Sequence, residues 1–274
     1  MNMLFDMTDE LDTVDTKSAI TVKTGDLFQL GNHRFLCGDC TIKENIDLLM
    51  NGKKADMVFT DPPYNVDYSS KNQFLNSIDK GNSIQREIKN DKMSDTCFYS
   101  FLFKVFNNIK NILNTYNSYY ICCSDRCIDI FIQALKENKF VYSNQIIWNK
   151  NNHVLCRSDY NYKHEPILYG WKDRHRFYGN GFFKTTVWDI AKLLKNDLHP
   201  TMKPIELIVN AILNSSLENM IVFDGFLGSG STLIACEYTN RICYGMEIEP
   251  HYCSVIINRW QKYTNKKAIK ILGV

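Results

Sequence analysis

No stretch of this sequence is apolar for long enough to cross a bilayer, so a membrane-spanning protein is not expected. Residues 1–15 are acidic and lack the basic and then apolar pattern of an export signal. The chain also has no large excess of positive or negative charge, because its 32 lysines and arginines nearly balance its 30 acids and leave a net charge of +2. We therefore expect a cytoplasmic protein, in which any strongly basic surface is local.

A paired metal-binding motif is missing as well, although the chain has 10 cysteines. Cys37 and Cys40 have the CxxC spacing, and His33 lies shortly upstream. A structural zinc site needs a second such pair or suitably spaced histidines, and no second CxxC exists. We expect no metal, and thiols that are reduced and mostly buried.

What the sequence does contain is an alternation of short apolar runs and amphipathic stretches, which is typical of a mainly parallel sheet with crossover helices. A chain of 274 residues that is 45% hydrophobic can bury a large α/β core. We expect one domain over 1–274, with a short N-terminal tail at 1–20. Strands are expected within 21–39 and at 55–60, 118–123, 144–150, 165–171, 220–226 and 242–248. Helices are expected at 98–113, 127–137, 204–216, 231–239 and 251–263.

A glycine loop, FDGFLGSGST at 223–232, joins an expected strand to an expected helix. Gly225, Gly228 and Gly230 permit a tight turn and a close approach of backbone N–H groups to a ligand. The helix N-terminus beyond them favours an anionic group. Glu247 ends the next strand at the carboxyl edge of the sheet, where it suits ribose hydroxyls. The loop alone fits any adenosine ligand, NAD included, or a purely structural turn.

The position of the loop distinguishes between two cofactors. An NAD enzyme would place this unit early and follow it with a second βαβαβ half. Here only one strand and one helix follow before Val274. A single adenosine with a short charged appendage is therefore favoured. S-adenosylmethionine fits, with its carboxylate at the helix end and its ribose on Glu247.

Three motifs follow one another along the chain: TDPPY at 60–64, HPTMKP at 199–204 and the glycine loop. In this order they resemble the amino-group DNA methyltransferases of the permuted β class, in which the catalytic motif precedes the cofactor motif. The similarity runs from about Gly25 to Lys267 and includes HEPILYGW and YCSVIINRW. One departure is Gly225, where the family usually has proline.

This resemblance implies a Rossmann-like fold with a seven-stranded, mostly parallel sheet and an inserted DNA-recognition region. It also implies S-adenosylmethionine as the cofactor and double-stranded DNA as the partner. Many relatives form homodimers, and some act beside a cognate restriction endonuclease, neither of which is visible in the sequence.

The resemblance makes Asp61, Pro62, Pro63 and Tyr64 the catalytic residues. The lone pair of an exocyclic amine is delocalised into its ring, so two hydrogen-bond acceptors are needed to free it for the methyl group. The Asp61 side chain and the Pro62 carbonyl are these acceptors, and the two prolines hold them in place. Asp61 orients the amine and stabilises developing positive charge rather than acting as a strong base. Tyr64 stacks on a base swung out of the duplex. An isolated DPPY would more often be a simple turn.

Further residues of the cofactor site follow from the same resemblance. Asp39 matches a position that accepts from the cofactor's adenine amine, although a turn-forming Gly-Asp pair is equally compatible. Lys203 is a natural partner for the cofactor's carboxylate. The full set is Asp39, Cys40, Asp61, His199, Thr201, Lys203, Asp224, Phe226, Gly228, Ser229, Gly230, Glu247 and Ile248.

Two basic regions are candidates for DNA contact. Residues 69–95 are polar and lysine-rich, which predicts a mobile DNA-contacting loop. Residues 172–195 mix basic and aromatic side chains, which predicts a target-recognition region. A solvated charged face is the alternative for both. The predicted DNA-binding residues are Lys71, Lys89, Arg174 and Arg176.

The sequence favours methylation of adenine N6. Cytosine-N4 methylation uses the same chemistry, but its enzymes more often have serine where Asp61 stands. Protein and RNA methyltransferases more often have asparagine there. An NAD-dependent oxidoreductase is disfavoured by the motif order, and a non-catalytic DNA-binding module by the joint presence of Asp61, Tyr64, Lys203 and Glu247. The target sequence cannot be read from the chain.

Overall fold

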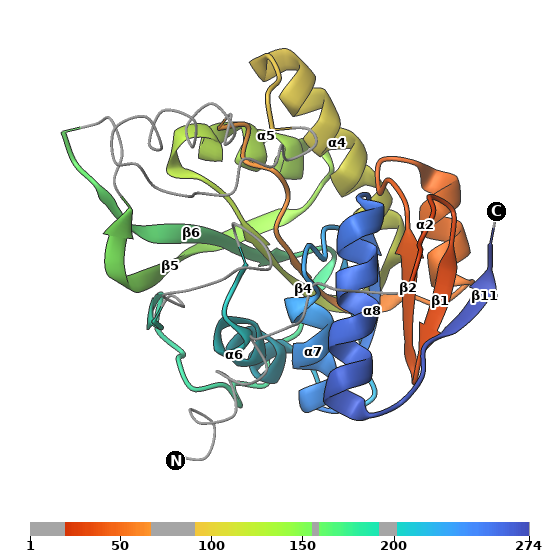
Figure 1. Cartoon of the computed structure of the whole chain (residues 1–274). Helices are drawn as coiled ribbons and strands as arrows, with labels where there is room; N and C mark the ends of the chain where they lie inside the picture. The colour runs from red at the N-terminus through yellow and green to blue at the C-terminus, as the bar shows by residue number, and fades with distance from the viewer. Residues whose placement is uncertain (1–19, 67–90, 155–158, 192–201, 274) are drawn as a thin grey trace, which may run out of the picture.

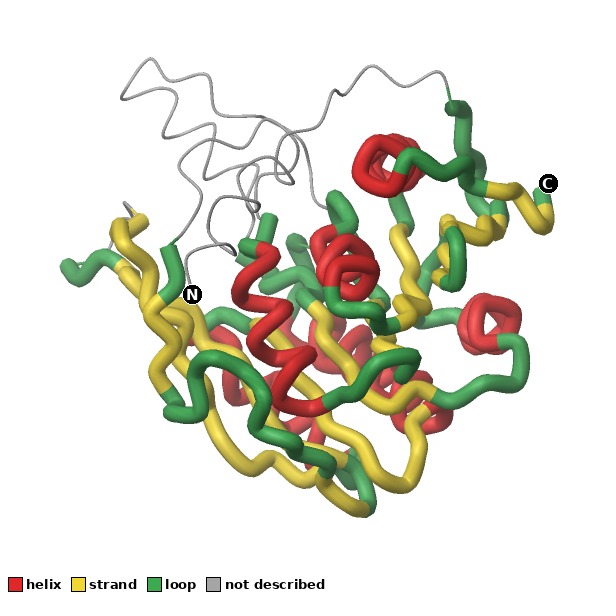
Figure 2. The backbone as a smooth tube through the Cα atoms, turned by 90° about the horizontal axis from the view of Figure 1, so that it is seen from below, coloured by secondary structure: helices red, strands yellow, loops and turns green. Residues whose placement is uncertain are grey.

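The computed structural model of the chain describes residues 20–66, 91–154, 159–191 and 202–273. One sheet of 11 strands crosses the molecule in the order β11-β1-β2-β10-β9-β3-β4-β6-β5-β8, and β7 pairs with β4 off this path. Figure 2 shows these strands as one twisted layer with helices on both of its sides.

The strands are β1 Leu27–Leu30, β2 His33–Cys37, β3 Ala55–Thr60, β4 Leu113–Cys122, β5 Val141–Val154, β6 Tyr162–Trp171, β7 Arg174–His175, β8 Val187–Asp189, β9 Ile221–Asp224, β10 Ile242–Glu247 and β11 Ile269–Leu272. The α-helices are α2 Lys43–Met50, α4 Asp95–Ile112, α5 Ile128–Glu137, α6 Ile205–Ser215, α7 Ser231–Tyr238 and α8 Pro250–Thr264. A short 3-10 helix, η1, spans Asp125–Cys127.

Seven neighbouring strands form the mostly parallel sheet that the resemblance implied. β2, β10, β9, β3 and β4 run parallel to one another, while β6 runs antiparallel between β4 and β5. Four further strands widen this sheet. β1 and β11 extend one edge in antiparallel pairing, β8 extends the other edge, and β7 pairs with the start of β4.

The central strand β3 shows why the sheet is covered on both faces. Met57 and Phe59 pack with α6, α7 and α8, whereas Val58 between them packs with α2, α4 and α5. Figure 1 shows α6, α7 and α8 grouped together over one face of the sheet. Successive side chains of a strand point to opposite faces, so a strand buried on both sides must be apolar throughout. The apolar residues Met57, Val58 and Phe59 have this cause, whereas Asp56 lies at the half-buried amino end of the strand.

The parallel arrangement decides where a site can form. β3, β4, β9 and β10 all end at the same edge of the sheet, and the loops that follow them converge there. DPPY directly follows β3, and the glycine loop directly follows β9. Two motifs separated by about 160 residues of sequence thus become neighbours.

The predicted strands and helices all occur, with boundaries shifted by a few residues. Helix α2 and strand β11 were not anticipated. Within 172–195, the described part to residue 191 contributes only the short strands β7 and β8. In the parts of the chain that the structure describes, no helix is long and apolar enough to cross a membrane.

Candidate active site

A pocket opens at the carboxyl edge, between the loop after β3, the glycine loop after β9 and the end of β10. Pro62, Pro63 and Tyr64 line it together with Asp61. The other predicted residues that line it are Asp39, Cys40, Lys203, Asp224, Phe226, Gly228, Ser229, Glu247 and Ile248. His199 and Thr201 lie outside the described residues.

The glycine loop needs its glycines for shape. Gly228 and Gly230 have φ values of 53° and 88°, a left-handed conformation that side chains disfavour. A Cβ on Gly230 would also lie 3.1 Å from Cγ1 of Ile256 on α8. Gly230 is the N-cap residue of α7 and is not among the pocket-lining residues. Gly230 therefore allows the turn of the loop and its packing against α8, and does not line the pocket itself.

Asp224 ties the glycine loop to the strand that precedes DPPY. Its Oδ1 accepts from the Thr60 hydroxyl at 2.8 Å and from the Phe226 N–H at 2.9 Å. Its Oδ2 accepts from the Thr232 hydroxyl at 2.6 Å. Burial raises the pKa of Asp224 to about 6, although these hydrogen bonds oppose the rise. Asp224 therefore fixes the two functional loops against each other.

Glu247 lies at the opposite wall of the pocket, at the end of β10. Its carboxylate accepts from the Gly228 N–H at 2.8 Å and from the Glu249 N–H at 2.9 Å. Burial raises the pKa of Glu247 to about 7, since it outweighs these backbone hydrogen bonds. A carboxylate held in this way has further lone pairs available for hydroxyl donors in the pocket.

Arg259 on α8 supports the glycine loop from below and was not identified from the sequence. Its Nη1 donates to the Ser229 carbonyl at 3.2 Å and to the Ser231 hydroxyl at 3.3 Å. The side chain is only 2% exposed. An arginine on the apolar face of an expected helix, within YCSVIINRW, was the available signal.

Gly225 occupies the position where the family usually has proline. A Cβ added there would lie 3.3 Å from Cβ and 3.4 Å from Sγ of Cys40. Cys40 is buried, and burial raises the pKa of its thiol well above the ordinary value. The glycine and the cysteine thus fill this part of the pocket wall together.

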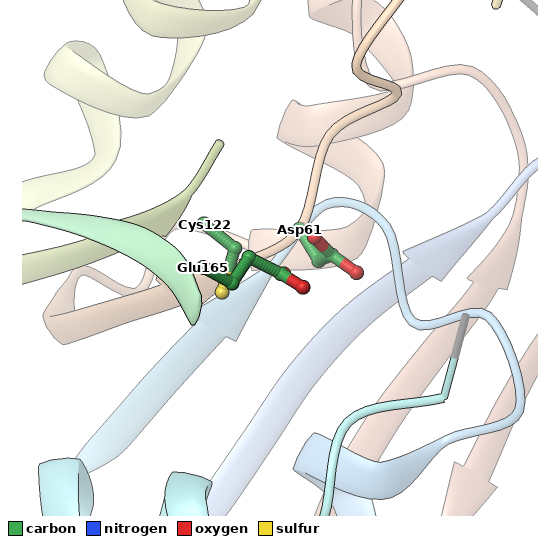
Figure 3. A group of neighbouring side chains, drawn as sticks. All are labelled: Asp61, Cys122 and Glu165. Carbon is green, nitrogen blue, oxygen red and sulfur yellow. The ribbon is translucent and has the colours of Figure 1, made fainter. Parts of the chain in front are cut away.

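The DPPY acid and tyrosine belong to a compact polar network. The Tyr64 hydroxyl lies 2.6 Å from Asp61 Oδ1 and 2.6 Å from Glu165 Oε1. The Lys203 ammonium lies 2.7 Å from Asp61 Oδ2 and 2.7 Å from Glu165 Oε1. Figure 3 shows Asp61, on the loop after β3, side by side with Glu165, on strand β6 two places along the sheet.

A second lysine completes the network. Lys150 on β5 donates to Glu165 Oε2 at 2.7 Å and lies 4.6 Å from the centre of the Trp148 ring. Burial raises the pKa of Glu165, but Lys203 and Lys150 outweigh it and bring the pKa to about 2. Burial also raises the pKa of Asp61, which the single neighbour Lys203 only partly offsets. Two carboxylates and two ammonium groups therefore balance in charge.

The comparisons with known proteins agree with this site. A family model described as DNA methylase, of the N6/N4 type, matches residues 55–259 and so spans both DPPY and the glycine loop. The chain belongs to this family. It is similar to the Type II methyltransferase M2.MboI of Moraxella bovis, at 28% identity over 235 residues, which cover 76% of this chain and 81% of that protein.

Solved structures resemble the methylase too. The M1.HpyAVI–SAM complex superposes with a TM-score of 0.59 at 25% identity, covering 82% of this chain and 97% of that one. A cytosine-N4-specific enzyme, the PvuII DNA methyltransferase, shares the fold at 14% identity with a TM-score of 0.67, covering 89% and 94%. The protein is therefore a DNA methyltransferase of the N6/N4 class that uses S-adenosylmethionine.

The structure adds contacts to one predicted cofactor residue of the methylase. Lys203 was assigned to the cofactor's carboxylate, but its ammonium lies 2.7 Å from both Asp61 and Glu165. Burial lowers the pKa of Lys203, and the two carboxylates more than reverse this, so the pKa is raised. Lys203 thus contacts Asp61 and Glu165, and its predicted contact with the cofactor's carboxylate stays a prediction. Glu165 and Lys150 were missed, although the charged residues in the apolar runs at 144–150 and 165–171 were visible.

Asp61, Cys122 and Glu165 present ligand atoms within 4.8 Å of one another, as a metal site would (Figure 3). The Lys203 ammonium, however, bonds to both carboxylates at this point. Burial also raises the pKa of the Cys122 thiol well above its ordinary value, so the thiolate that a metal prefers is disfavoured. His33 does not offer a ring nitrogen to the CxxC pair, because its ring bonds to Glu237 and to the Cys243 N–H.

The predicted DNA-binding arginines lie away from the predicted catalytic residues. Arg176 forms an ion pair with Asp56 at 2.8 Å, and Arg174 bonds to the Tyr116 hydroxyl at 2.7 Å. Both partners are at the amino ends of β3 and β4, the opposite edge of the sheet from Asp61. At about 3.3 Å a residue, the five positions from Asp56 to Asp61 span about 16 Å. Their placement does not favour DNA contact. Lys71 and Lys89 lie outside the described residues.

Proposed function

We propose that this methylase transfers a methyl group to the exocyclic N6 of a flipped-out adenine in double-stranded DNA, and that it belongs to the β class. The observation that supports this most directly is an aspartate at position 61, which lines the same pocket as the glycine loop and Glu247. Cytosine-N4 enzymes more often have serine there. The order of DPPY before the glycine loop supports the β class.

The residues present suit the proposed chemistry. S-adenosylmethionine supplies an electrophilic methyl carbon on a sulfonium. The amine nitrogen forms a bond to this carbon as the carbon–sulfur bond breaks, and the positive charge passes from sulfur to nitrogen. Asp61 and the Pro62 carbonyl orient the two N–H groups so that the lone pair faces the methyl group. One N–H proton then leaves to solvent. Tyr64 offers its ring as the surface on which the everted base stacks.

The pocket also suits the cofactor. Glu247 would accept from the ribose hydroxyls, since its carboxylate is already oriented by two backbone N–H groups. Asp39 Oδ1 accepts from the Thr41 N–H at 2.8 Å, so the Gly-Asp turn exists, and its second oxygen remains for an adenine amine in the pocket. Gly228 and Ser229 bring their backbone close to the ligand.

The same geometry suggests where DNA lies. The described residues on either side of 67–90 meet at the pocket: Val66 and Asp91 line it, and Asn65 and Met93 exchange two hydrogen bonds of 2.9 and 2.6 Å. The β5–β6 hairpin also extends from this edge beyond the helices (Figure 1), with the exposed Lys163 on its second strand. We place the duplex against these two features, where phosphate contacts would position a base over Asp61.

Two predicted partners stay predictions: a homodimer, to be tested by sedimentation, and a cognate restriction endonuclease. A cytoplasmic location also stays a prediction.

The function is tested with purified protein, labelled S-adenosylmethionine and DNA of mixed sequence. After digestion to nucleosides we expect the label in N6-methyladenine and none after an Asp61→Ala change. Label in N4-methylcytosine would replace adenine by cytosine as the target. Absence of label in any nucleoside from the unmodified protein would refute the proposal.

A further inference from the structure

Both oxygens of Asp61 are already bonded. Oδ1 lies 2.6 Å from the Tyr64 hydroxyl, and Oδ2 lies 2.7 Å from the Lys203 ammonium. The proposed reaction requires Asp61 to accept a hydrogen bond from the target amine, and an oxygen whose present donor withdraws accepts more strongly than one that shares its lone pairs between two donors. A buried carboxylate that loses a donor without replacement is destabilised, which makes the source of the free oxygen important.

The position of Tyr64 offers a way to free Oδ1. Its hydroxyl lies equally close, at 2.6 Å, to Asp61 Oδ1 and to Glu165 Oε1. A phenol has a single hydrogen, so it donates to only one of the two carboxylates at a time. Rotation of the O–H bond moves this hydrogen from Asp61 to Glu165 while the Tyr64 ring stays in place. Burial raises the pKa of Tyr64 well above its ordinary value, so the hydroxyl keeps its hydrogen.

We propose that Glu165 is a positioning residue that takes over the Tyr64 hydroxyl and shares the Lys203 ammonium, and so frees Asp61 to bind the target amine. The inference rests on the proposed amine methylation at Asp61, and it holds for adenine and cytosine alike. It gives a role to a residue of β6 that does not itself touch the reacting atoms.

The surroundings of Glu165 fit such a role. Lys150 holds Oε2 at 2.7 Å and is itself 7% exposed, which leaves Oε1 directed at Tyr64 and Lys203. With a pKa of about 2, Glu165 remains an ionised acceptor throughout the working range of pH. The two acids and two lysines balance in charge, so a neutral base can enter without leaving a net buried charge.

A purely structural role for Glu165 makes a different prediction. If Glu165 only neutralises the two lysines, its loss should weaken the site by the same factor whether or not residue 64 has a hydroxyl. If it acts by drawing the hydroxyl away from Asp61, its loss should matter much less once that hydroxyl is gone. A double-mutant cycle separates the two cases.

The cycle uses single-turnover methyl transfer from labelled S-adenosylmethionine to DNA for the unmodified protein, Glu165→Gln, Tyr64→Phe and the double variant. Tyr64→Phe keeps the ring for stacking and removes the hydroxyl. We expect Glu165→Gln to slow transfer by about 10-fold to 100-fold when Tyr64 is intact, and by less than about 3-fold in the Tyr64→Phe background. Equal factors in both backgrounds would overturn the proposal.

Glu137→Gln is the matched control. Glu137 on α5 also accepts from a tyrosine hydroxyl, that of Tyr99, but at an exposed position away from the pocket. We expect this change to leave the transfer rate unaltered. Transfer slowed as much as by Glu165→Gln would show a general effect of losing such a pair and would count against the proposal.

A further variant guards against a folding defect. Glu165→Gln leaves Lys150 buried without its acid, so Lys150→Met combined with Glu165→Gln removes both charges. We expect this protein to bind S-adenosylmethionine as the unmodified one does and to transfer as slowly as Glu165→Gln. Recovery of transfer would show that Glu165 merely neutralises Lys150. A lack of transfer by the unmodified protein would instead refute the proposed function.

Discussion

Strand β3 has one aspartate near each end, and the two differ in what surrounds them. Asp56, at the amino end, accepts at Oδ1 from Arg176 and from Asn114, both at 2.8 Å. Its Oδ2 accepts from the Ile221 N–H at 3.0 Å. Asp61, just past the carboxyl end, is bonded instead to a tyrosine hydroxyl and a lysine ammonium.

The difference lies in whether the donors have another acceptor. The donors on Asp61 are shared with Glu165, whereas within the described residues no second carboxylate is bonded to the donors on Asp56. A carboxylate with committed donors, one of them a backbone N–H, holds strands in register. A carboxylate whose donors can transfer to a neighbour can accept a substrate. The same residue type, once within β3 and once just after it, thus serves structure at one edge of the sheet and the proposed chemistry at the other.

The largest effect is expected from Asp61→Ala. Without the carboxylate, the target amine loses an oriented acceptor, and methyl transfer should fall by at least about 10³-fold. Equilibrium binding of S-adenosylmethionine should persist, because the glycine loop and Glu247 remain. Transfer at an undiminished rate would remove Asp61 from the mechanism.

Asp56→Asn should give the opposite pattern. The change leaves Arg176 without its ionic partner and one backbone N–H with a poorer acceptor, which should lower the free energy of unfolding by about 1–3 kcal/mol. Urea denaturation measures this loss. Transfer per folded molecule should stay within about 2-fold of the unmodified rate. A large loss of transfer with unchanged stability would contradict a purely structural role for Asp56.

The pH dependence of cofactor binding provides the next test. The pKa of Glu247 is raised to about 7, so below that pH the carboxyl is neutral and accepts weakly from ribose hydroxyls. If only the ionised form binds, the dissociation constant for S-adenosylmethionine should rise about 10-fold from pH 8 to pH 6. Calorimetry measures it, and Glu247→Gln should bind weakly at both values.

The same group affects the stability of the cofactor-free protein, with the sign reversed. Between its ordinary pKa of 4.5 and the raised value of about 7, folded Glu247 retains a proton that the unfolded chain has lost. This contribution to stability is therefore present at low pH and declines as the pH rises through the window. Glu247→Gln should reduce that part of the slope, and an unchanged slope would contradict the assignment.

The smallest effects concern DNA. Lys163→Ala, at the hairpin on the carboxyl edge, should weaken DNA binding by a few-fold and reduce the slope of its logarithm against salt by about 1. Arg174→Ala, at the amino edge, should change neither quantity. Fluorescence anisotropy over a range of salt concentrations compares the pair. The reverse outcome would place the duplex at the amino edge.

The sequence was sufficient for the elements with a strong local signal. β3 was predicted at its observed bounds, because burial on both faces forces an apolar run that prolines then end. The glycine loop was recognisable because its backbone conformation restricts the residues that fit. Both motifs meet in one pocket because parallel strands end at one edge.

The rest depended on contacts between distant segments. The contacts of Lys203 with Asp61 and Glu165 were not predicted, because sequence order does not tell which acids a buried lysine reaches. Glu165 became visible only through the antiparallel placement of β6 beside β4. Arg176 looked like a surface cation until the short strand β7 paired with the start of β4 and brought it to Asp56.

The pairing of the sheet also constrains how the protein is made. β2 lies between β1 and β10, and β3 lies between β4 and β9, so each of these two strands lacks one of its two partners until residues beyond 220 have left the ribosome. Pairings between such distant segments close slowly and leave strand edges open meanwhile. A nascent chain halted before β9 should therefore need a chaperone to stay free of aggregates.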